Sequence, residues 1–414
     1  TSNKERCSYL LIFTSIISLY LYIDHLIIFA HTKKWPDIPT RIRFNLRNKS
    51  SCKSLNDSVI KTLGNEYDKW SLTVLNKYSN NLIDINGTSS RIPASNQKLF
   101  TTAFALDRLG PNHKLNTKIT VKADNNVFID GQGDPDFDVN DLNSLLNNAF
   151  KSVNSDNHVN YFIRESTRDN WWPITWSNYD KQYSYGAPIT KIAFLSNSSL
   201  EYPFSLMNEV INSHNNRFLY SSSISFLNDN TINKKRNINT TFIKYSAPLY
   251  SLISLANSES HNYTAEILLR NSAGTWNQTK ASLSLLSWMA KQNIPLSGIK
   301  IEDGSGLSRS NRLTSSSLAF LLHKMSRHRY KYYFESSLSI AGIRGTMKQS
   351  IKLNFKENKF YGKTGTLNGI RTLSGNLYTK SGVRHISIMS EYSEQPGEII
   401  NKILNIIASD HSCY

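Results

Sequence analysis

Residues 93–110 read "PASNQKLFTTAFALDRLG", a polar start that leads into an apolar run. The apolar residues recur three and four positions apart, which predicts a helix, and Gly110 with the proline after it predicts where that helix ends. Ser95 and Lys98 stand three apart at the helix start, so they share one face and the amine can reach the hydroxyl. One interpretation makes Ser95 a nucleophile and Lys98 its proton acceptor. The alternative makes Ser95 a helix cap and Lys98 a solvated cation, because an isolated Ser-x-x-Lys is common by chance.

The length, composition and net charge limit the classes of protein to which this chain can belong. The chain has 414 residues, more than one hydrophobic core usually spans, which predicts at least two domains. Hydrophobic residues make up 39% and aromatic residues 11%, so we expect a packed interior and exclude wholesale disorder. The net charge of +17 favours an anionic partner. The basic clusters at 234–236 and 323–334 come with no RNA- or DNA-binding motif, so we interpret them as solvated faces and expect no nucleic-acid partner.

The N-terminal segment indicates export. Lys4 and Arg6 precede an apolar run that is uncharged from Cys7 to Ile23. A basic start ahead of such a run is typical of a secretory signal peptide or a signal anchor, so we assign residues 1–33 to one of these. The expected location is the periplasm or cell envelope. Cleavage of the segment and anchoring to the inner membrane are both left open.

The cysteines have no metal-ligand spacing and form no Cys-x-x-Cys pair. Cys52 and Cys413 could be joined in an exported chain, and two separate thiols are an equal alternative. We predict no metal site and no cofactor.

The remaining pattern predicts an α+β fold. An alternating stretch at 70–78 indicates a strand, and residues 116–244 hold short alternating runs such as "TKITVKA" and "NYFIRE" with many turn residues. Helical spacing returns from about 247 to 325. The end of the chain alternates again in "KFYGKTGTL", "IRTLSGNLYT" and "RHISIMSEY", and an amphipathic helix closes it. We therefore expect a helical cluster against an antiparallel sheet, interrupted by a β-rich insertion.

Two further short motifs bear on the choice between the two interpretations of Ser95 and Lys98. Ser260-His261-Asn262 precedes a predicted helix, and Lys363-Thr364-Gly365-Thr366 lies on a predicted strand. In this order, Ser-x-x-Lys, Ser-x-Asn and Lys-Thr-Gly are the three signatures of penicillin-binding proteins and serine β-lactamases. Each motif is weak alone, and together they favour the nucleophile interpretation strongly.

The chain resembles the class C low-molecular-mass penicillin-binding proteins, the D-alanyl-D-alanine carboxypeptidase/endopeptidase family (peptidase family S13). Further stretches match that family from about residue 65 onward: "GQGDPDF" (131–137), "YGAP" (185–188), "IEDGSGLSRSNRLT" (301–314) and "AGIRGTMKQ" (341–349). The resemblance implies a multidomain α+β fold, with a penicillin-binding transpeptidase-like domain in two parts, 34–115 and 245–414, around an inserted β-rich domain at 116–244. The first two motifs lie 165 residues apart (260 − 95), which leaves room for that insertion.

The resemblance also implies roles for the three motifs. Ser95 would form the acyl-enzyme, and Lys98 would accept its proton, provided that burial and a second cation such as Lys363 lower the lysine pKa. Ser260 would relay the proton to the leaving group, and Asn262 would hold the substrate's amide.

The strand motif would bind the other end of the substrate. Lys363, Thr364 and Thr366 would bind the terminal carboxylate, with Gly365 between them on the same strand. The backbone N–H groups of Ser95 and Thr366 would form the oxyanion hole.

Two positions carry less specific signals. Asp180 would help a side pocket for the diamino acid of a peptide substrate, and a plain surface carboxylate is the alternative. His261 stands where relatives usually have Asp, and we interpret it as structural or solvent-facing.

The implied function is a serine-type D-Ala-D-Ala carboxypeptidase, or DD-endopeptidase, acting on peptidoglycan stem peptides and acylated by β-lactams. The alternatives are a β-lactamase or esterase on the same scaffold, and a catalytically idle, basic wall-binding protein. The sequence leaves the balance of carboxypeptidase and endopeptidase cleavage open, because both share the acylation step.

Other motifs do not support a competing function. "GQGDPD" lacks the third glycine of a dinucleotide loop, and Asp134, Asp136 and Asp138 lack the glycine and glutamate of a calcium loop, which favours loop capping. Ser305 in "DGSGLS" lacks a full nucleophile elbow. The glycines beside it predict a loop that passes close to the active site.

Overall fold

The computed structural model describes residues 52–122, 124–152, 158–197, 207–213, 222–227, 239–354, 359–411 and 413, all within one compact unit, Lys49–Tyr414. The predicted export segment at 1–33 and the basic cluster at 234–236 lie outside the described residues. None of the helices within these ranges combines the length and hydrophobicity that crossing a membrane requires.

A six-stranded antiparallel sheet forms the larger part of the structure, with strand order β2-β1-β11-β10-β9-β8. Its strands are β1 (Trp70–Asn76), β2 (Asn81–Ile85), β8 (Ser339–Ile340), β9 (Lys359–Leu367), β10 (Ile370–Thr379) and β11 (Gly382–Glu391). β10 and β11 are buried over most of their length, because helices cover both faces of the sheet. The alternating sequences at 70–78 and from 359 onward are thereby confirmed as strands.

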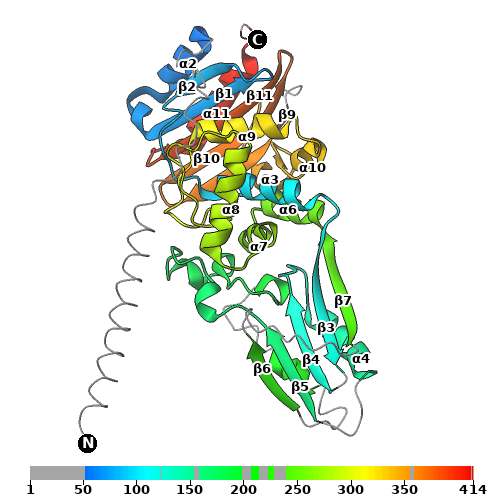
Figure 1. Ribbon diagram of the computed structural model, residues 1–414. Coiled ribbons are helices and arrows are strands. Elements are labelled where there is room, and N and C mark those ends of the chain that lie inside the picture. Colours follow the sequence, from blue (N-terminus) through cyan, green and yellow to red (C-terminus); the bar gives the residue numbers. More distant parts are fainter. Residues whose placement is uncertain are drawn as a thin grey trace, which may run out of the picture. The chain divides into compact units, whose positions relative to one another are not determined.

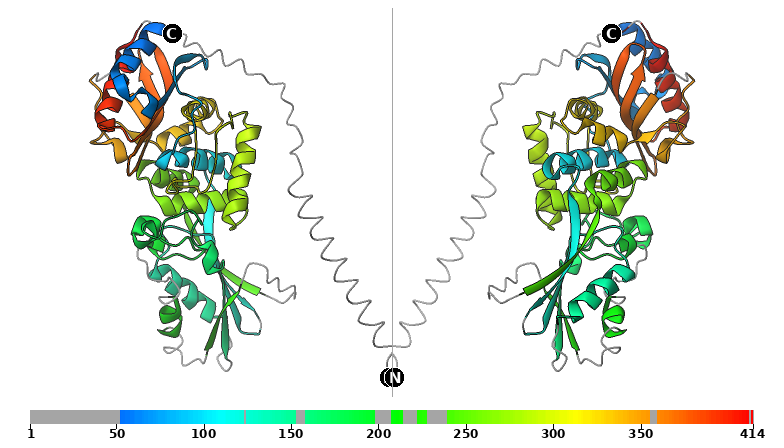
Figure 2. Two further views of the ribbon diagram at one scale, coloured as in Figure 1. Left: turned by 90° about the vertical axis from the view of Figure 1, so that its left-hand side faces the viewer. Right: turned by 90° about the vertical axis from the view of Figure 1, so that its right-hand side faces the viewer.

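The two helical layers differ in size. On one face α2 (Lys53–Leu63) and α11 (Pro396–Ser409) pack against the sheet and share one hydrophobic core with it. The other face carries a larger cluster built around α3 (Gln97–Leu109) and α9 (Ser315–Met325). Figures 1 and 2 show the sheet between these layers. The remaining helices of the cluster are α6 (Leu249–Ser258), α7 (Asn262–Ala273), α8 (Gln278–Lys291) and α10 (Lys331–Ser336).

The helix α3 is the centre of the larger cluster. Its residues from Gln97 to Leu106 are buried, including the side chain of Lys98. Gly110 ends the helix with φ of 79°, a left-handed conformation that glycine adopts without steric cost. A helix with a fully buried lysine in its first turn needs partners for that amine.

A disulfide joins Cys52, just before α2, to Cys413, beyond α11, with the two Cα atoms 5.8 Å apart. It therefore fastens the two ends of the described chain on one face of the sheet. Of the two alternatives that the sequence left open, the structure has the bridge.

Removing this bridge is expected to destabilise the protein. A Cys52→Ser, Cys413→Ser variant should lose about 2–5 kcal/mol of unfolding free energy, because the unfolded chain regains conformational freedom. Denaturant unfolding measures the loss. Reductant should shift the wild-type midpoint towards that of the variant and leave the variant unchanged. Equal midpoints for wild type and variant under oxidising conditions would contradict the prediction.

A second, five-stranded sheet lies between α3 and α6 in the chain, with order β6-β5-β4-β3-β7. Its strands are β3 (Lys114–Lys122), β4 (Asn126–Gly131), β5 (Val159–Arg164), β6 (Ser222–Leu227) and β7 (Asn239–Pro248). β3 pairs antiparallel with β4 and β7, whereas β4–β5 and β5–β6 are parallel. The sheet occupies the predicted insertion, and the division of the chain into domains stays a prediction.

One helix in this region departs from the expected run of short strands. α4 (Val139–Phe150) begins at Asp138, whose carboxylate accepts from the Asp141 N–H in a capping box. Its buried residues pack against the five-stranded sheet. The loop-capping interpretation is confirmed for Asp138, and for Asp134, whose carboxylate accepts from the Asp136 N–H. The helix that Asp138 caps is an addition to the predicted β-rich pattern.

Short segments complete the elements. They are the 3-10 helices η1 (Gly64–Lys69), η2 (Ala94–Asn96), η3 (Arg168–Asn170), η4 (Asp180–Gln182), η5 (Ser184–Gly186), η6 (Leu195–Asn197) and η7 (Gly345–Met347), and a helical stretch at 207–213.

Candidate active site

Ser95 lies in the tight turn η2, immediately before α3. The residue before it, Ala94, has φ of 46°, a left-handed conformation that costs a non-glycine residue roughly 1–2 kcal/mol. Neither η2 nor α3 has a side-chain cap, so Ser95 is not a helix cap. Strain of this kind persists only where the surroundings hold it, and it concentrates at functional sites.

The six-stranded sheet holds this turn in place. The Thr372 hydroxyl on β10 donates to the Pro93 carbonyl at 2.9 Å, and the Asn96 side chain donates to the Ser374 hydroxyl at 2.8 Å. Both contacts are buried. They fix the Ser95 backbone against the strand that neighbours β9.

Lys98 is 0% exposed and its Nζ has three oxygen partners. It lies 3.0 Å from the Ser95 Oγ, 2.6 Å from the Asn262 Oδ1 and 2.7 Å from the Ser305 carbonyl oxygen. The solvated-cation interpretation of Lys98 is therefore wrong. Burial lowers the pKa of Lys98 to about 7, against the opposing effect of the Asp303 and Glu266 carboxylates.

The three partners determine what a neutral amine does here. An amide oxygen and a backbone carbonyl can only accept hydrogen bonds, whereas a hydroxyl can also donate. A protonated Lys98 donates to all three. A neutral Lys98 has two N–H donors, which match the Asn262 and Ser305 oxygens, and one lone pair left for the Ser95 O–H. Losing one proton therefore turns Lys98 from a donor to Ser95 into an acceptor from it.

The second and third motifs meet beside this group. The Nζ of Lys363, also 0% exposed, donates to the Ser260 Oγ at 2.8 Å and to the Thr364 carbonyl at 2.9 Å. Burial holds the pKa of Lys363 well below its ordinary value, and the charge of Lys98 lowers it further. A charge on Lys98 therefore makes it less favourable for Lys363 to be charged as well. Burial, rather than Lys363, is the main cause of the lowered Lys98 pKa.

Ser260 is held in an unusual backbone conformation, with φ of 63°. Asn262 begins α7, and its amide group donates to the Tyr185 carbonyl at 2.9 Å while its oxygen accepts from Lys98. Both polar ends of the Asn262 side chain are therefore engaged, which fixes its orientation.

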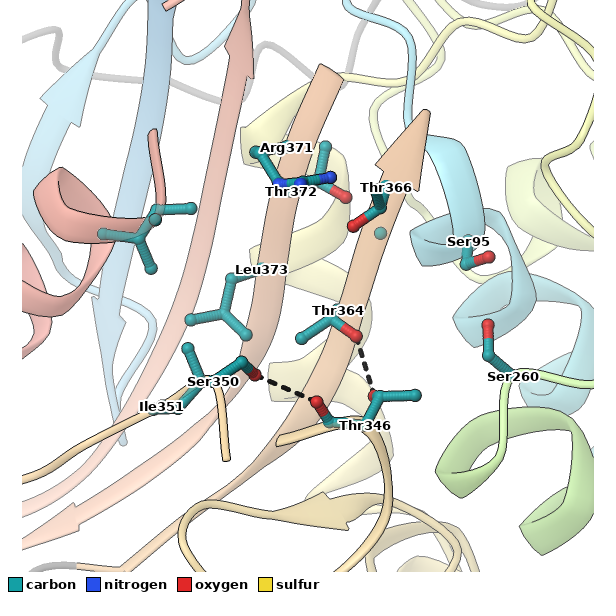
Figure 3. A pocket seen from close by; sticks show the side chains of 13 residues that line it. Ser95, Ser260, Thr346, Ser350, Ile351, Thr364, Thr366, Arg371, Thr372 and Leu373 are labelled. Carbon is teal, nitrogen blue, oxygen red and sulfur yellow. Dashed lines mark hydrogen bonds between the residues drawn. The ribbon is translucent and has the colours of Figure 1, made fainter. Parts of the chain in front are cut away.

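Gly365 lets β9 approach the Ser95 turn. A side chain at this position would lie 2.2 Å from the Thr372 Oγ1 and 3.0 Å from the Ser95 backbone nitrogen, which no Cβ could occupy. The strand β9 therefore passes directly against the Ser95 turn at Gly365, the residue before Thr366. Figure 3 shows Ser95 and Ser260 lying across from the Thr364–Thr366 segment of β9.

A groove runs along this segment, with a volume of about 360 Å³. Its lining contains Ser95, Ser260, Thr346, Ser350, Ile351, Thr364, Gly365, Thr366, Arg371, Thr372, Leu373, Gly397 and Ile400. The Thr364 hydroxyl donates to the Thr346 hydroxyl at 2.7 Å (Figure 3). A groove that reaches from a serine hydroxyl to threonine hydroxyls suits a small polar ligand with an anionic end.

The loop that follows Asp303 closes the floor of the site. The Asp303 carboxylate accepts from the Gly306 and Ser308 N–H groups, each at 2.7 Å, and from the Trp176 indole at 2.8 Å. A side chain at Gly306 would lie 1.8 Å from the Ala94 carbonyl oxygen. The predicted close passage of this loop is confirmed, and it places the Ser305 carbonyl on Lys98.

A buried ion pair fastens the same loop to α7. The Oε1 of Glu266 accepts from the Gly304 and Ser305 N–H groups, each at 2.8 Å, and its Oε2 accepts from Arg270 at 2.9 Å. Glu266 and Arg270 are both 0% exposed. Burial raises the pKa of Glu266, and Arg270 opposes that rise. Glu266, held by Arg270, therefore fixes the loop whose Ser305 carbonyl accepts from the Lys98 amine.

His261 takes no direct part in this network. Its Nδ1 lies 2.7 Å from the Thr264 hydroxyl, and burial together with the charge of Lys98 lowers its pKa to about 4. A neutral ring bonded to the first turn of its own helix supports the structural interpretation of His261.

Asp180 lies in η4 and lines a second pocket, of about 570 Å³, that shares Ser95 and Asn262 with the site. Its carboxylate accepts from the Ser177 hydroxyl at 2.6 Å and from the Tyr185 hydroxyl at 3.2 Å. The structure thus brings every predicted site residue to one connected region, with Asp180 at its edge.

Sequence reasoning missed partners that have no side-chain signature. The carbonyls of Ser305 and Tyr185 accept from Lys98 and Asn262, and such backbone acceptors cannot be found from residue type. Glu266 and Arg270 stand four apart on α7, a spacing that predicts a pair but not its burial.

Ligand-type side chains for a metal gather at one place in the described ranges, Cys52, Asp410 and Cys413. Both sulfurs there are consumed by the disulfide, so the group does not fit a metal ion.

Comparison with known proteins gives consistent similarities. The sequence model of the D-Ala-D-Ala carboxypeptidase 3 (S13) family matches residues 57–201 and 220–409, more than half of the chain. A D-alanyl-D-alanine carboxypeptidase of Actinomadura sp. (strain R39) is 21% identical over 414 residues, which cover 76% of each protein.

Solved structures share the fold. Penicillin binding protein 4 (dacB) from Haemophilus influenzae aligns with a TM-score of 0.71 at 17% identity, over 86% of this chain and 99% of that one. Its complex with a β-lactam aligns with a TM-score of 0.67, at the same identity and coverage. Bd3459, a predatory peptidoglycan endopeptidase from Bdellovibrio bacteriovorus, aligns with a TM-score of 0.56 at 20% identity, over 83% of this chain and 92% of that one.

Proposed function

Since the chain belongs to the D-Ala-D-Ala carboxypeptidase 3 (S13) family of serine peptidases, we propose that Ser95 is its nucleophile and Lys98 the base that activates it. The carrying observation is the buried Lys98 amine, bonded at once to the Ser95 hydroxyl, the Asn262 side chain and the Ser305 carbonyl. Burial keeps the amine neutral often enough to accept a proton. The substrate is the D-Ala-D-Ala end of a peptidoglycan stem peptide.

Acylation follows from this geometry. Neutral Lys98 takes the proton of the Ser95 hydroxyl as the oxygen attacks the carbonyl carbon of the penultimate D-alanine. The backbone N–H groups of Ser95 and Thr366 stabilise the resulting oxyanion. The C–N bond then breaks, and the proton that Lys98 took from Ser95 passes through Ser260, which Lys363 contacts at 2.8 Å, to the leaving nitrogen, so that Lys98 is neutral again.

Deacylation reverses these roles with water as the nucleophile. Water gives a proton to the base, adds to the acyl carbon and releases the Ser95 oxygen, which regains its proton. The enzyme is then restored, and the peptide leaves with a new carboxyl end.

The surrounding residues bind the substrate's two ends. Lys363, Thr364 and Thr366 bind the carboxylate of the leaving group, with Gly365 allowing the strand to approach. At the other end Asp180 contributes to the pocket that receives the third, diamino residue of the stem peptide. β-Lactams, which bind the structurally similar H. influenzae protein, acylate the same serine.

The cell envelope is the proposed place of action, because peptidoglycan lies there. Residues 1–33 direct export and, if retained, anchor the chain to the inner membrane. The penicillin-binding domain comprises 34–115 and 245–414, around an inserted domain at 116–244.

The function is tested by incubating purified muropeptides with the protein and measuring the masses of the products by mass spectrometry. Loss of one D-alanine from pentapeptides identifies carboxypeptidase cleavage, and conversion of cross-linked dimers to monomers identifies endopeptidase cleavage. Fluorescent penicillin is incubated in parallel. Stable labelling with peptide cleavage supports the proposal, rapid turnover of the label without peptide cleavage indicates a β-lactamase, and neither labelling nor cleavage indicates an idle wall-binding protein.

The pH dependence of acylation is a further expectation. Lys98 must be neutral to accept the proton, and its pKa of about 7 replaces the ordinary value of 10.5. The second-order rate of acylation should therefore rise through pH 7 and level off above about pH 8, falling about tenfold per pH unit on the acid side. Stopped-flow labelling between about pH 5.5 and 10.5 measures this. A rising limb centred near pH 10 would show that Lys98 keeps its ordinary pKa and is charged in the resting enzyme at pH 7.

A further inference from the structure

Arg371 is the one charged residue among those that line the 360 Å³ groove along β9. The rest of the lining consists of serines, threonines, glycines and aliphatic residues. A positive charge that no carboxylate in the groove balances favours an anionic ligand.

The register of the sheet places Arg371 beside the substrate-binding strand. Arg371 on β10 is paired directly with Thr366 on β9, and Leu373 with Thr364. Side chains of directly paired residues lie on the same face, with Cβ atoms about 4.5–5.5 Å apart. Arg371 and both threonines therefore line the same face of the groove, and Figure 3 shows the Arg371 side chain beside that of Thr366.

The guanidinium of Arg371 is free to bind a ligand. Within the described part of the chain its side chain has neither a hydrogen-bond acceptor nor an ion-pair partner, and it is exposed. Other arginines near the site are engaged: Arg309 donates to the Asn368 carbonyl at 3.1 Å, and Arg344 donates to the Leu338 carbonyl at 2.6 Å.

The nearby lysine is poorly suited to hold an anion alone. The Nζ of Lys363 already donates to Ser260 and to the Thr364 carbonyl. Burial and Lys98 also hold its pKa well below the ordinary value, so its charge is not permanent. An arginine keeps its charge throughout the physiological range and matches the two oxygens of a carboxylate with two parallel donors.

We propose that Arg371, with the hydroxyls of Thr364 and Thr366, binds the carboxylate next to the scissile bond and makes that carboxylate a requirement for efficient cleavage. This inference rests on the proposed function of Ser95. What Arg371 adds is selectivity: it favours leaving groups that carry an α-carboxylate over those that carry an uncharged amide at the same place. Leaving groups with an amide in that position are poor substrates.

The test compares two substrates that differ only in this charge. An acylated D-Ala-D-Ala peptide and its C-terminal amide are cleaved by wild type, Arg371→Ala and Arg371→Lys, and kcat/KM is measured for each from the released amino acid or amino amide. The matched control is Arg108→Ala, which removes an exposed arginine from the far end of α3, roughly 20 Å along the helix from Ser95.

The expected result is selective. Arg371→Ala should lower kcat/KM for the carboxylate substrate about 10- to 100-fold and leave the amide nearly unchanged, because one charge-assisted contact is lost. Arg371→Lys should recover part of the loss, and Arg108→Ala should match wild type on both substrates.

Three outcomes would overturn the inference. Equal loss on both substrates would assign Arg371 a structural role, and no loss on either would leave it a solvated residue. Cleavage of neither substrate by wild type would overturn the proposed function, and this inference with it.

Discussion

Replacing Ser95 by alanine is expected to abolish covalent labelling by fluorescent penicillin and to slow the release of D-alanine by at least about 10⁴-fold. The hydroxyl oxygen forms the only covalent bond between enzyme and substrate in the proposed mechanism, and no other hydroxyl contacts the Lys98 amine in the described residues. Gel fluorescence measures the labelling, and mass spectrometry of a defined pentapeptide measures the cleavage.

Lys98→Met should cost nearly as much, because serine and base act as one unit. The Ser95→Ala, Lys98→Met double variant should then be no slower than Ser95→Ala alone, since effects of groups that act together do not add. Ser58→Ala, at an exposed serine of α2, is the matched control and should label like wild type. Retained labelling of the Ser95→Ala protein would refute the assignment of the nucleophile.

Removing the buried arginine of α7 is expected to destabilise the fold strongly. Arg270→Met leaves the Glu266 carboxylate buried without its partner, which should lower the free energy of unfolding by about 3–5 kcal/mol. Arg270 also has two buried nitrogens without a hydrogen-bond partner among the described residues, so burying this arginine itself lowers the free energy of unfolding. Thermal or denaturant unfolding gives the change directly.

The double variant Arg270→Met, Glu266→Gln separates charge from packing. Glutamine retains an oxygen that can accept from the Gly304 and Ser305 N–H groups, and it carries no charge to be left unpaired. The double variant should therefore be more stable than Arg270→Met alone. If the two are equally stable, Glu266 is already uncharged in the wild type and the ion-pair argument fails.

The same substitution has a second expected readout in catalysis. Glu266 holds the loop whose Ser305 carbonyl accepts from Lys98, so loosening it should misplace the Lys98 amine. Folded Arg270→Met protein should acylate more slowly than wild type at temperatures well below its unfolding transition.

Much of the scaffold could be predicted from local pattern. The alternating runs near the C-terminus are β9, β10 and β11, and the stripe of isoleucines and leucine at 400–407 is buried on α11. These elements each bury one clear face, so periodicity alone defines them. The three motifs also predicted which side chains converge, through the resemblance to a family whose members carry the same motifs in the same order.

Other features depend on contacts that local pattern does not contain. α4 has helical spacing and a capping aspartate, yet it lies among strand-forming segments rich in Asn and Ser, which drew the prediction towards β structure. The parallel pairing of β4, β5 and β6 depends on how the chain crosses over, not on residue type. The free guanidinium of Arg371 became visible only with the strand register.

The segment after β5 bears on how this protein could have diversified. The first residue of β3, Lys114, is paired with the last residue of β7, Pro248, so the chain enters and leaves the second sheet at one place. A segment connected in this way could be gained or lost as a unit. Yet the Tyr185 carbonyl accepts from the Asn262 side chain, and the Trp176 indole donates to the Asp303 carboxylate. The inserted segment therefore also supports the proposed catalytic residues. A descendant that lost the inserted segment would have to replace these contacts to Asn262 and Asp303. The inserted segment and the proposed catalytic residues are therefore expected to be inherited together.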